Sequence, residues 1–148
     1  MLLSCYYPQM TLRMNEGTRS APLFSTNITP IMVEGKPHYL ELPQKQLPTS
    51  TSPAITDWDG DGLHDLLICL FIKENKVIWH RNIGKKGQPN FSKPEVLLDF
   101  SKTGKPKTCN RLDVEDFNND GKLDLIIGGG YFISNSKKDS GAWIYLQK

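Results

Sequence analysis

The chain has 148 residues, a formal net charge of +2, 23% charged residues and 38% hydrophobic residues. This length suits one ordinary domain, and the composition excludes a disordered chain. No apolar run approaches the ~18 residues of a membrane-spanning helix, so no membrane span is expected. The three cysteines form no even disulfide framework, and Cys69, inside an apolar run, is interpreted as a small buried hydrophobe.

The N-terminal third of the chain predicts short strands followed by a linker. The strands lie at about residues 2–7, 10–15 and 31–33, and the proline-containing stretch 34–53 is interpreted as the linker. Residues 1–7 match residues 65–71, so that Met1 stands where the last Asp of an acidic loop would lie. We therefore expect the chain to begin just after a missing loop of that kind.

The next predicted strand, at about 52–57, leads into the acidic loop 57–65. Carboxylates stand at alternating positions of this loop, in Asp57, Asp59, Asp61 and Asp65, and Gly62 at position 6 allows a sharp turn. Such carboxylates can converge on one hard cation, and Ca²⁺ fits best because it takes six to eight oxygens in a flexible shell. An EF-hand is excluded, because position 12 is Ile68 instead of Glu. The alternative is an Asp- and Gly-rich hairpin turn without a metal.

The same pattern recurs later in the chain. The second loop spans 116–124, with oxygen-bearing side chains at Asp116, Asn118, Asp120 and Asp124 and glycine at Gly121. Further strands are predicted at about 65–72, 76–82, 96–98, 110–116, 124–133 and 142–147. A turn with the pattern Asn-x-Gly followed by Phe also occurs twice, from Asn15 and from Asn82, and we expect it to need a positive φ. A period near sixty residues that holds several strands is typical of propeller blades.

The loop motif with its Asp-Leu-aliphatic exit, together with the Asn-x-Gly…Phe turn, resembles the FG-GAP/VCBS repeats. These repeats form the calcium-binding β-propeller of integrin α-subunits and of many secreted microbial proteins, and the VCBS-like branch is the closer match. The resemblance implies two Ca²⁺ sites, in which Asn118 weakens the second. The implied ligands are Asp57, Asp59, Asp61, the carbonyl of Leu63 and Asp65, and then Asp116, Asn118, Asp120, the carbonyl of Lys122 and Asp124.

The predicted fold is all-β, a partial β-propeller of about two and a half four-stranded antiparallel blades with calcium loops between strands 1 and 2. Residues 1–47 are expected to form a blade that lacks strand 1, 48–100 a complete blade, and 101–148 a blade that lacks strand 4. Ten strands cannot close a propeller ring. We therefore expect the remaining blades to come from a longer parent chain, and expect apolar faces and self-association in this segment alone.

The sequence does not favour an enzyme. No Ser, Cys or Lys is placed beside a base by a recognisable motif, and His38, His64 and His80 are interpreted as surface or packing residues. The expected function is calcium-stabilised binding or adhesion, outside the cell or on its envelope. The alternative is an accessory domain of a larger secreted polysaccharide-active enzyme.

Loop lysines point to a possible class of ligand. They cluster at 85–86, 102–107 and 137–138, and a basic surface attracts anionic glycans. A protein or an anionic glycan is therefore the ligand considered, although ordinary solvated loop lysines are the favoured explanation of the clusters. Nucleic acid is not expected, because no platform of alternating aromatic and basic residues is present.

Overall fold

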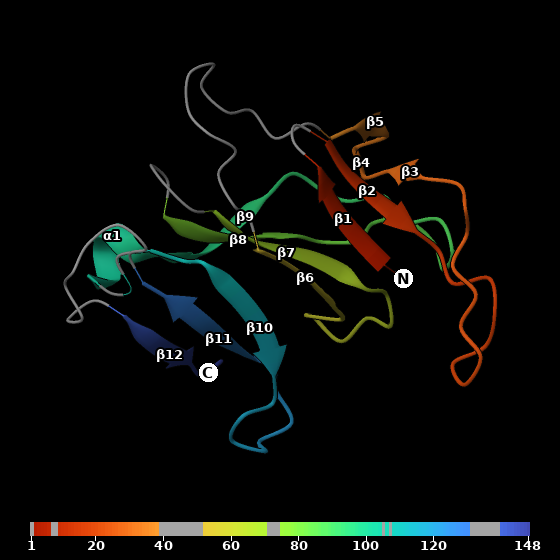
Figure 1. Ribbon diagram of the computed structural model, residues 1–148. Coiled ribbons are helices and arrows are strands. Elements are labelled where there is room, and N and C mark those ends of the chain that lie inside the picture. Colours follow the sequence, from red (N-terminus) through yellow and green to blue (C-terminus); the bar gives the residue numbers. More distant parts are fainter. Residues whose placement is uncertain are drawn as a thin grey trace. The chain divides into compact units, whose positions relative to one another are not determined.

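The computed structural model describes residues 2–6, 9–38, 52–70, 75–104, 106, 108–130 and 140–148 (Figure 1). As predicted, the described chain is nearly all β, in several small antiparallel sheets. It also contains one short helix. It divides into two compact units. Unit 1 comprises Met1–Pro48 with Arg81–Lys93, and unit 2 comprises Thr49–His80 with Pro94–Lys148. No helix in the described ranges is long and apolar enough to cross a membrane.

Unit 1 contains one three-stranded sheet and one small hairpin. The sheet has the order β1-β2-β3, from β1 (Leu2–Tyr6), β2 (Gln9–Arg13) and β3 (Thr29–Pro30). The hairpin pairs β4 (Met32–Val33) with β5 (Lys36–Pro37). The first two strands lie where the sequence predicts them.

The prediction of a third strand in unit 1, at about residues 31–33, is partly wrong. The chain pairs with β2 at Thr29–Pro30, and Met32–Val33 then turns back on Lys36–Pro37. The reason is the tight turn at Glu34 and Gly35, whose φ values of +49° and +76° suit a two-residue hairpin. The hairpin also places β5 inside the stretch interpreted as a linker, most of which lies outside the described residues.

The two Asn-x-Gly turns are copies of each other, and both belong to unit 1. Asn15 bridges Phe24, and Asn82 bridges Phe91. The Asn15 Oδ1 accepts from the backbone N–H groups of Gly17 and Leu23 at 3.0 and 2.9 Å. The Asn82 Oδ1 accepts from those of Gly84 and Asn90 at 3.0 and 3.3 Å.

The prediction that the glycines of the Asn-x-Gly pattern have positive φ is wrong. Neither Gly17 nor Gly84 is among the described residues with positive φ. Glycine is needed instead because the opposite strand passes too close for a side chain. A Cβ on Gly84 would press on the Gln88 carbonyl and lie 2.6 Å from the Asn90 nitrogen, and a Cβ on Gly17 would meet Leu23 in the same way.

Unit 2 holds two sheets that follow the predicted strand order. The first is four-stranded, in the order β6 (Ser52–Thr56), β7 (Asp65–Leu70), β8 (Lys76–His80) and β9 (Glu95–Asp99). The second is three-stranded, in the order β10 (Arg111–Glu115), β11 (Asp124–Gly129) and β12 (Gly141–Tyr145). These strands match the predicted ones within a few residues wherever the structure describes them. The assignment of three blades to 1–47, 48–100 and 101–148 stays a prediction.

A one-turn helix that the sequence analysis did not predict joins the two sheets of unit 2. It is α1 (Phe100–Thr103), and the carboxylate of Asp99 accepts from the Ser101 N–H at its start. Gly104 ends it with a φ of +75°. Asp before and Gly after a short segment are the usual signals of helix ends, so the sequence did contain the information.

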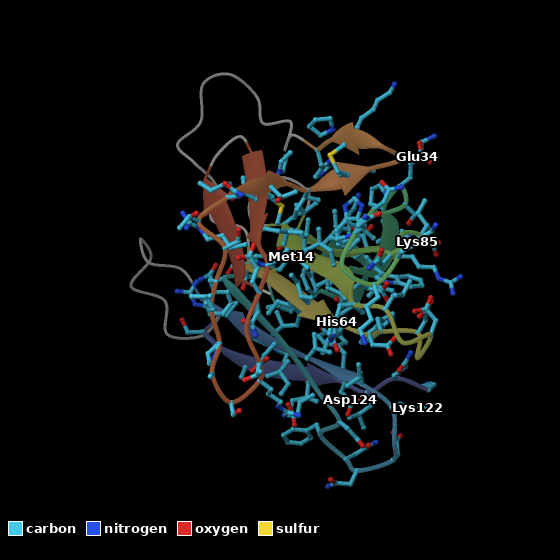
Figure 2. All side chains as sticks on the ribbon, turned by 90° about the vertical axis from the view of Figure 1, so that its right-hand side faces the viewer. Met14, Glu34, His64, Lys85, Lys122 and Asp124 are labelled. Carbon is cyan, nitrogen blue, oxygen red and sulfur yellow. A yellow bond between two sulfur atoms is a disulfide. The ribbon has the colours of Figure 1, made fainter. Side chains whose placement is uncertain are left out.

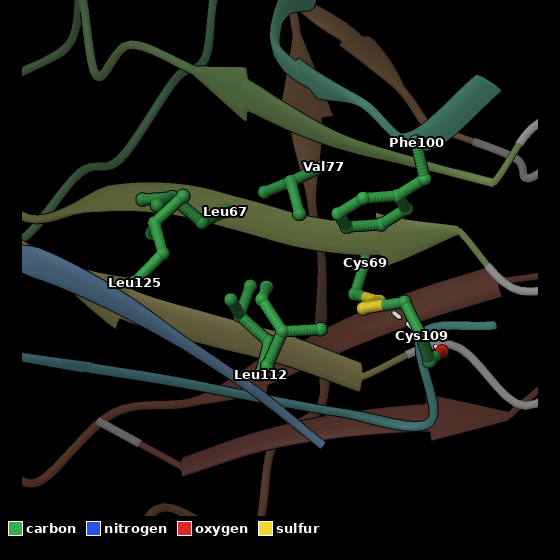
Figure 3. Close-up of a cluster of buried hydrophobic side chains, with 8 residues drawn as sticks. Leu67, Cys69, Val77, Phe100, Cys109, Leu112 and Leu125 are labelled. Atoms are coloured by element: carbon green, nitrogen blue, oxygen red, sulfur yellow. Dashed lines mark hydrogen bonds between the residues drawn. A yellow bond between two sulfur atoms is a disulfide. The ribbon is translucent and has the colours of Figure 1, made fainter. Parts of the chain in front are cut away.

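The core of unit 2 lies between its two sheets (Figure 3). Leu67, Cys69 and Val77 project from the first sheet, and Leu125 and Ile127 from the second. The remaining members of the cluster are Phe100, Cys109 and Leu112. The sheets are also joined by a buried hydrogen bond, in which the N–H of Leu112 donates to the Ser52 hydroxyl at 2.9 Å.

A disulfide joins Cys69 to Cys109 within this core (Figure 3), across a Cα–Cα distance of 6.0 Å. Both cysteines are fully buried. The predicted burial of Cys69 is confirmed, but the expectation that the cysteines form no disulfide framework is wrong for this pair. An odd number of cysteines does not prevent one pair from forming, and the packing of β7 against the segment before β10 brings these two together.

Reducing this disulfide should lower the free energy of unfolding by about 2–4 kcal/mol, because a cross-link 40 residues apart in sequence restricts the unfolded chain. Urea unfolding with and without a phosphine reductant measures the difference. The double variant Cys69→Ala/Cys109→Ala should be insensitive to the reductant. Equal midpoints for the oxidised and reduced wild-type chain would contradict a stabilising cross-link.

Candidate metal centre

The first acidic loop connects β6 to β7 and is wrapped around its own carboxylates. The Gly62 N–H donates to Asp57 Oδ2 at 2.9 Å, and the Leu63 N–H donates to Asp61 Oδ1 at 2.9 Å. Gly60 and Gly62 have φ values of +75° and +88°. The sharp turn expected at Gly62 is therefore present, and it is a conformation that side chains with a Cβ rarely adopt.

Three carboxylates of this loop meet at one point. Asp57, Asp59 and Asp61 each offer an oxygen, and these oxygens all lie within 4.8 Å of one another. The Asp57 Oδ1 is buried and has no hydrogen-bond partner among the described residues. A buried carboxylate oxygen without a partner is costly, and a cation would satisfy it. The residues present therefore fit a hard metal ion bound through oxygen.

The other two predicted ligands of the first loop lie beside this group. Asp65 begins β7 and is fully buried, and its Oδ2 accepts from the Trp58 N–H at 3.2 Å. This bond ties the last residue of the loop to its second residue. The roles of Asp65 and of the Leu63 carbonyl as metal ligands stay predictions.

The second loop, between β10 and β11, has the same backbone course. Asn119 and Gly121 have φ values of +58° and +86°, at the positions of Gly60 and Gly62. The Gly121 N–H donates to Asp116 Oδ2 at 2.9 Å, and the Lys122 N–H donates to Asp120 Oδ1 at 2.9 Å. The sequence therefore holds a further signal that the loop analysis missed, which is a residue that tolerates positive φ at loop position 4.

Buried Asp124 closes the second loop (Figure 2). Its Oδ2 accepts from the Phe117 N–H at 3.0 Å, as Asp65 does from Trp58, and its Oδ1 accepts from the Gln147 N–H at 2.9 Å. Asp124 thus also holds the segment after β12 against the start of β11.

The two loops differ in how their first and third residues are satisfied. The Asp116 Oδ1 accepts from the Asp120 N–H at 3.0 Å, whereas the matching Asp57 Oδ1 has no partner in the described part of the chain. The Asn118 amide donates to Asp120 Oδ2 at 3.0 Å. The Lys122 N–H, as the larger cause, and this amide lower the pKa of Asp120. Only the first loop gathers three acidic groups within the described ranges, and the second predicted metal site stays a prediction.

The histidines lie in three different settings. His64, in the first loop, is exposed (Figure 2), as predicted for a side chain that points away from the carboxylates. His80 is fully buried in β8, which matches a packing residue. His38 is half-buried, and this burial lowers its pKa.

Comparison with known families adds one finding. Residues 57–127 match the FG-GAP-like repeat. The chain carries an FG-GAP-like repeat. The match runs from Asp57 through the second loop to Ile127 in β11, so it contains both acidic loops, and repeats of this family are β-propeller-like. No curated protein and no solved structure matches the chain.

The requirement for a left-handed backbone conformation at loop position 4 can be tested in the second loop of the FG-GAP-like repeat. Asn119→Ala should lower the free energy of unfolding by about 1 kcal/mol. Alanine has a Cβ that makes the left-handed conformation unfavourable, and it lacks the polar side chain with which asparagine can offset that cost. Asn119→Gly should change it by less than about 0.5 kcal/mol, because glycine adopts positive φ freely. Denaturant unfolding of the two variants beside the wild type gives both values. Equal effects of Ala and Gly would show that side-chain contacts, and not φ, decide this position.

Proposed function

We propose that the loop 57–65 of the FG-GAP-like repeat binds one Ca²⁺ ion, and that the repeat is a calcium-stabilised binding or adhesion module rather than an enzyme. The observation that carries this proposal is the convergence of Asp57, Asp59 and Asp61, with the buried Asp57 Oδ1 left without a partner among the described residues. Three anionic oxygens in so small a space repel one another, and a divalent cation reverses that repulsion.

The donor set favours Ca²⁺ over other divalent ions. The gathered side chains are carboxylates, which suit hard cations, and thiolate and imidazole ligands are absent from the group. Asp59 and Asp61 are exposed, so water can complete the coordination shell. Ca²⁺ accepts a flexible shell of six to eight oxygens, whereas Mg²⁺ demands a near-ideal octahedron.

An ion in this loop would stabilise the strand that follows it. The loop passes directly into β7, whose residues from Asp65 to Cys69 are all buried. The ion would hold Asp57 at the end of β6 close to Asp61, and so fix the distance between the two strands at this end. Calcium would therefore act on the fold of the repeat and on whatever surface the repeat presents.

A location outside the cell or on its envelope fits two features of the chain. The disulfide between Cys69 and Cys109 is of a kind that persists in oxidising compartments. Extracellular modules work with weak calcium sites of ~10⁻⁴–10⁻³ M, because free Ca²⁺ is abundant there. The repeat would act beside further repeats of a longer chain, and its ligand would be a protein or an anionic glycan. The exposed Lys85, Lys86 and Lys102 support a glycan.

Calcium should raise the melting temperature of the chain, because an ion that binds the folded state stabilises it by mass action. At one hundred times the dissociation constant the gain is about 2.7 kcal/mol, which corresponds to roughly 5–10 °C for a chain of this size. Calorimetry in Ca²⁺ and in chelator measures the shift. Asp57→Asn should abolish most of it, while Asp113→Asn, an exposed carboxylate on β10, should not. An unchanged melting temperature of the wild type would refute the proposal.

The first loop should bind Ca²⁺ more tightly than the second, since it offers one more carboxylate. In addition, its Asp57 Oδ1 has no hydrogen-bond partner among the described residues. Terbium luminescence can separate the loops. Trp58 lies within the first loop and sensitises an ion there, whereas the second loop carries Phe117 at the same position. Phe117→Trp should add a weaker second phase to the titration, and Asn118→Asp in that background should strengthen it. A second phase tighter than the first would reverse the ranking.

A further inference from the structure

The two copied turns of unit 1 differ sharply in how their phenylalanines are covered. Phe91 is fully buried, whereas Phe24 is 40% exposed and its neighbour Leu23 is 64% exposed. The turns themselves do not explain this, because their hydrogen bonds match. The Ser25 N–H donates to the Met14 carbonyl at 2.9 Å, and the Ser92 N–H donates to the Arg81 carbonyl at 2.8 Å.

Phe91 is covered by an extended strand. Its N–H donates to the Met32 carbonyl at 2.8 Å, and its carbonyl accepts from the Glu34 N–H at 2.8 Å. The pairing of Val33 with Phe91 is parallel. Two side-chain contacts fix the end of this strand beyond Val33. Asn90 Oδ1 accepts from the Gly35 N–H at 2.9 Å, and Lys93 forms an ion pair with Glu34 at 3.5 Å.

Phe24 presents the same edge without such a strand among the described residues. In both turns, the hydrogen bonds between the two sides of the turn are made by the residues before and after the phenylalanine. The N–H and carbonyl of the phenylalanine itself therefore point to the outer edge, away from the turn. At Phe91 these two groups hold β4. At Phe24 they lie beside an exposed phenyl ring and an exposed leucine, which together form an edge that a strand can extend.

We propose that Leu23 and Phe24 form a docking site for an extended strand of another repeat, which pairs in parallel with Phe24 as β4 pairs with Phe91. The copy at Phe91 defines what this partner looks like. It is an extended pair of apolar residues followed by a third residue. The carbonyl of the first residue accepts from the Phe24 N–H, and the N–H of the third donates to the Phe24 carbonyl.

The partner must differ from β4 at its end. Leu23 stands at the position of Asn90, and Thr26 at the position of Lys93. Leucine cannot accept the hydrogen bond that Gly35 donates to Asn90, and threonine cannot pair with an acid as Lys93 pairs with Glu34. An apolar residue where β4 is followed by Gly35 would instead contact the exposed Leu23, and a neutral residue where β4 is followed by Glu34 would leave no acid without its ion pair.

A peptide made to this description tests the site. The probe is an acetylated, amidated peptide of residues 30–35 that carries Glu34→Thr and Gly35→Leu, titrated to millimolar concentration into the isotope-labelled chain. Amide resonances of Leu23 and Phe24 should shift in a saturable way, and exchange of the Phe24 N–H with solvent should slow. Phe24→Ala should weaken binding by about tenfold or more, and Phe117→Ala, another exposed phenylalanine, should leave it unchanged.

A second peptide separates strand pairing from unspecific apolar contact. Methylation of the backbone nitrogen at the threonine removes the N–H that would donate to the Phe24 carbonyl, and binding should again fall by about tenfold. Equal binding of both peptides, or shifts at residues 82–91 in place of Leu23 and Phe24, would overturn the proposal. Absence of any shift at Leu23 and Phe24 in the wild-type chain would do so even if Phe24→Ala does not fold. Protection of the Phe24 N–H that rises with protein concentration alone would assign the edge to a second copy of this chain instead.

Discussion

The burial of β7 is the constraint on which unit 2 depends. Leu66, Leu67, Ile68 and Cys69 are fully buried, between β6 and β8 within the sheet and against the second sheet on one face. Each such side chain contributes on the order of 2 kcal/mol by leaving water. The same strand begins with Asp65, which closes the acidic loop, and carries Cys69 toward the disulfide near its other end. The proposed metal loop and the cross-link therefore fix opposite ends of one buried strand.

The acidic loops concentrate charge where a folded chain would ordinarily avoid it. Backbone N–H groups offset part of that cost, since Asp57, Asp61, Asp116 and Asp120 each accept at least one of them. The arrangement requires left-handed residues at loop positions 4 and 6, which glycine and asparagine supply. What distinguishes the loops is the Oδ1 of the first aspartate, satisfied by a neighbouring N–H in the second loop and without a described partner in the first. This oxygen and the convergence of Asp57, Asp59 and Asp61 make the first loop the better candidate for a metal ion.

Unit 1 shows how one local motif serves two environments. The turns that begin at Asn15 and Asn82 have the same hydrogen bonds and the same close approach at glycine. Pairing of the following phenylalanine depends instead on a segment distant in sequence, because β4 pairs with the backbone of Phe91. The conformation of each turn is thus set by local hydrogen bonds, whereas pairing of the phenylalanine edge requires another strand.

The sequence by itself determined the features that rest on short-range patterns. Alternating carboxylates with glycine at position 6 located both loops, and apolar runs located the strands around them. Glycine at position 6 correctly implied a sharp turn at Gly62 and Gly121, which both have positive φ, because that conformational freedom belongs to the residue itself. Tertiary structure alone decided the pairing of Cys69 with Cys109, because it depends on which strand packs against which across 40 residues of chain. It also decided why Gly17 and Gly84 are glycines, since the obstacle to a side chain there is the backbone of the opposite strand. Local sequence patterns specify the backbone conformation of a segment. Which segment packs against it, or forms a disulfide with it, depends on the tertiary structure and cannot be read from one stretch of sequence.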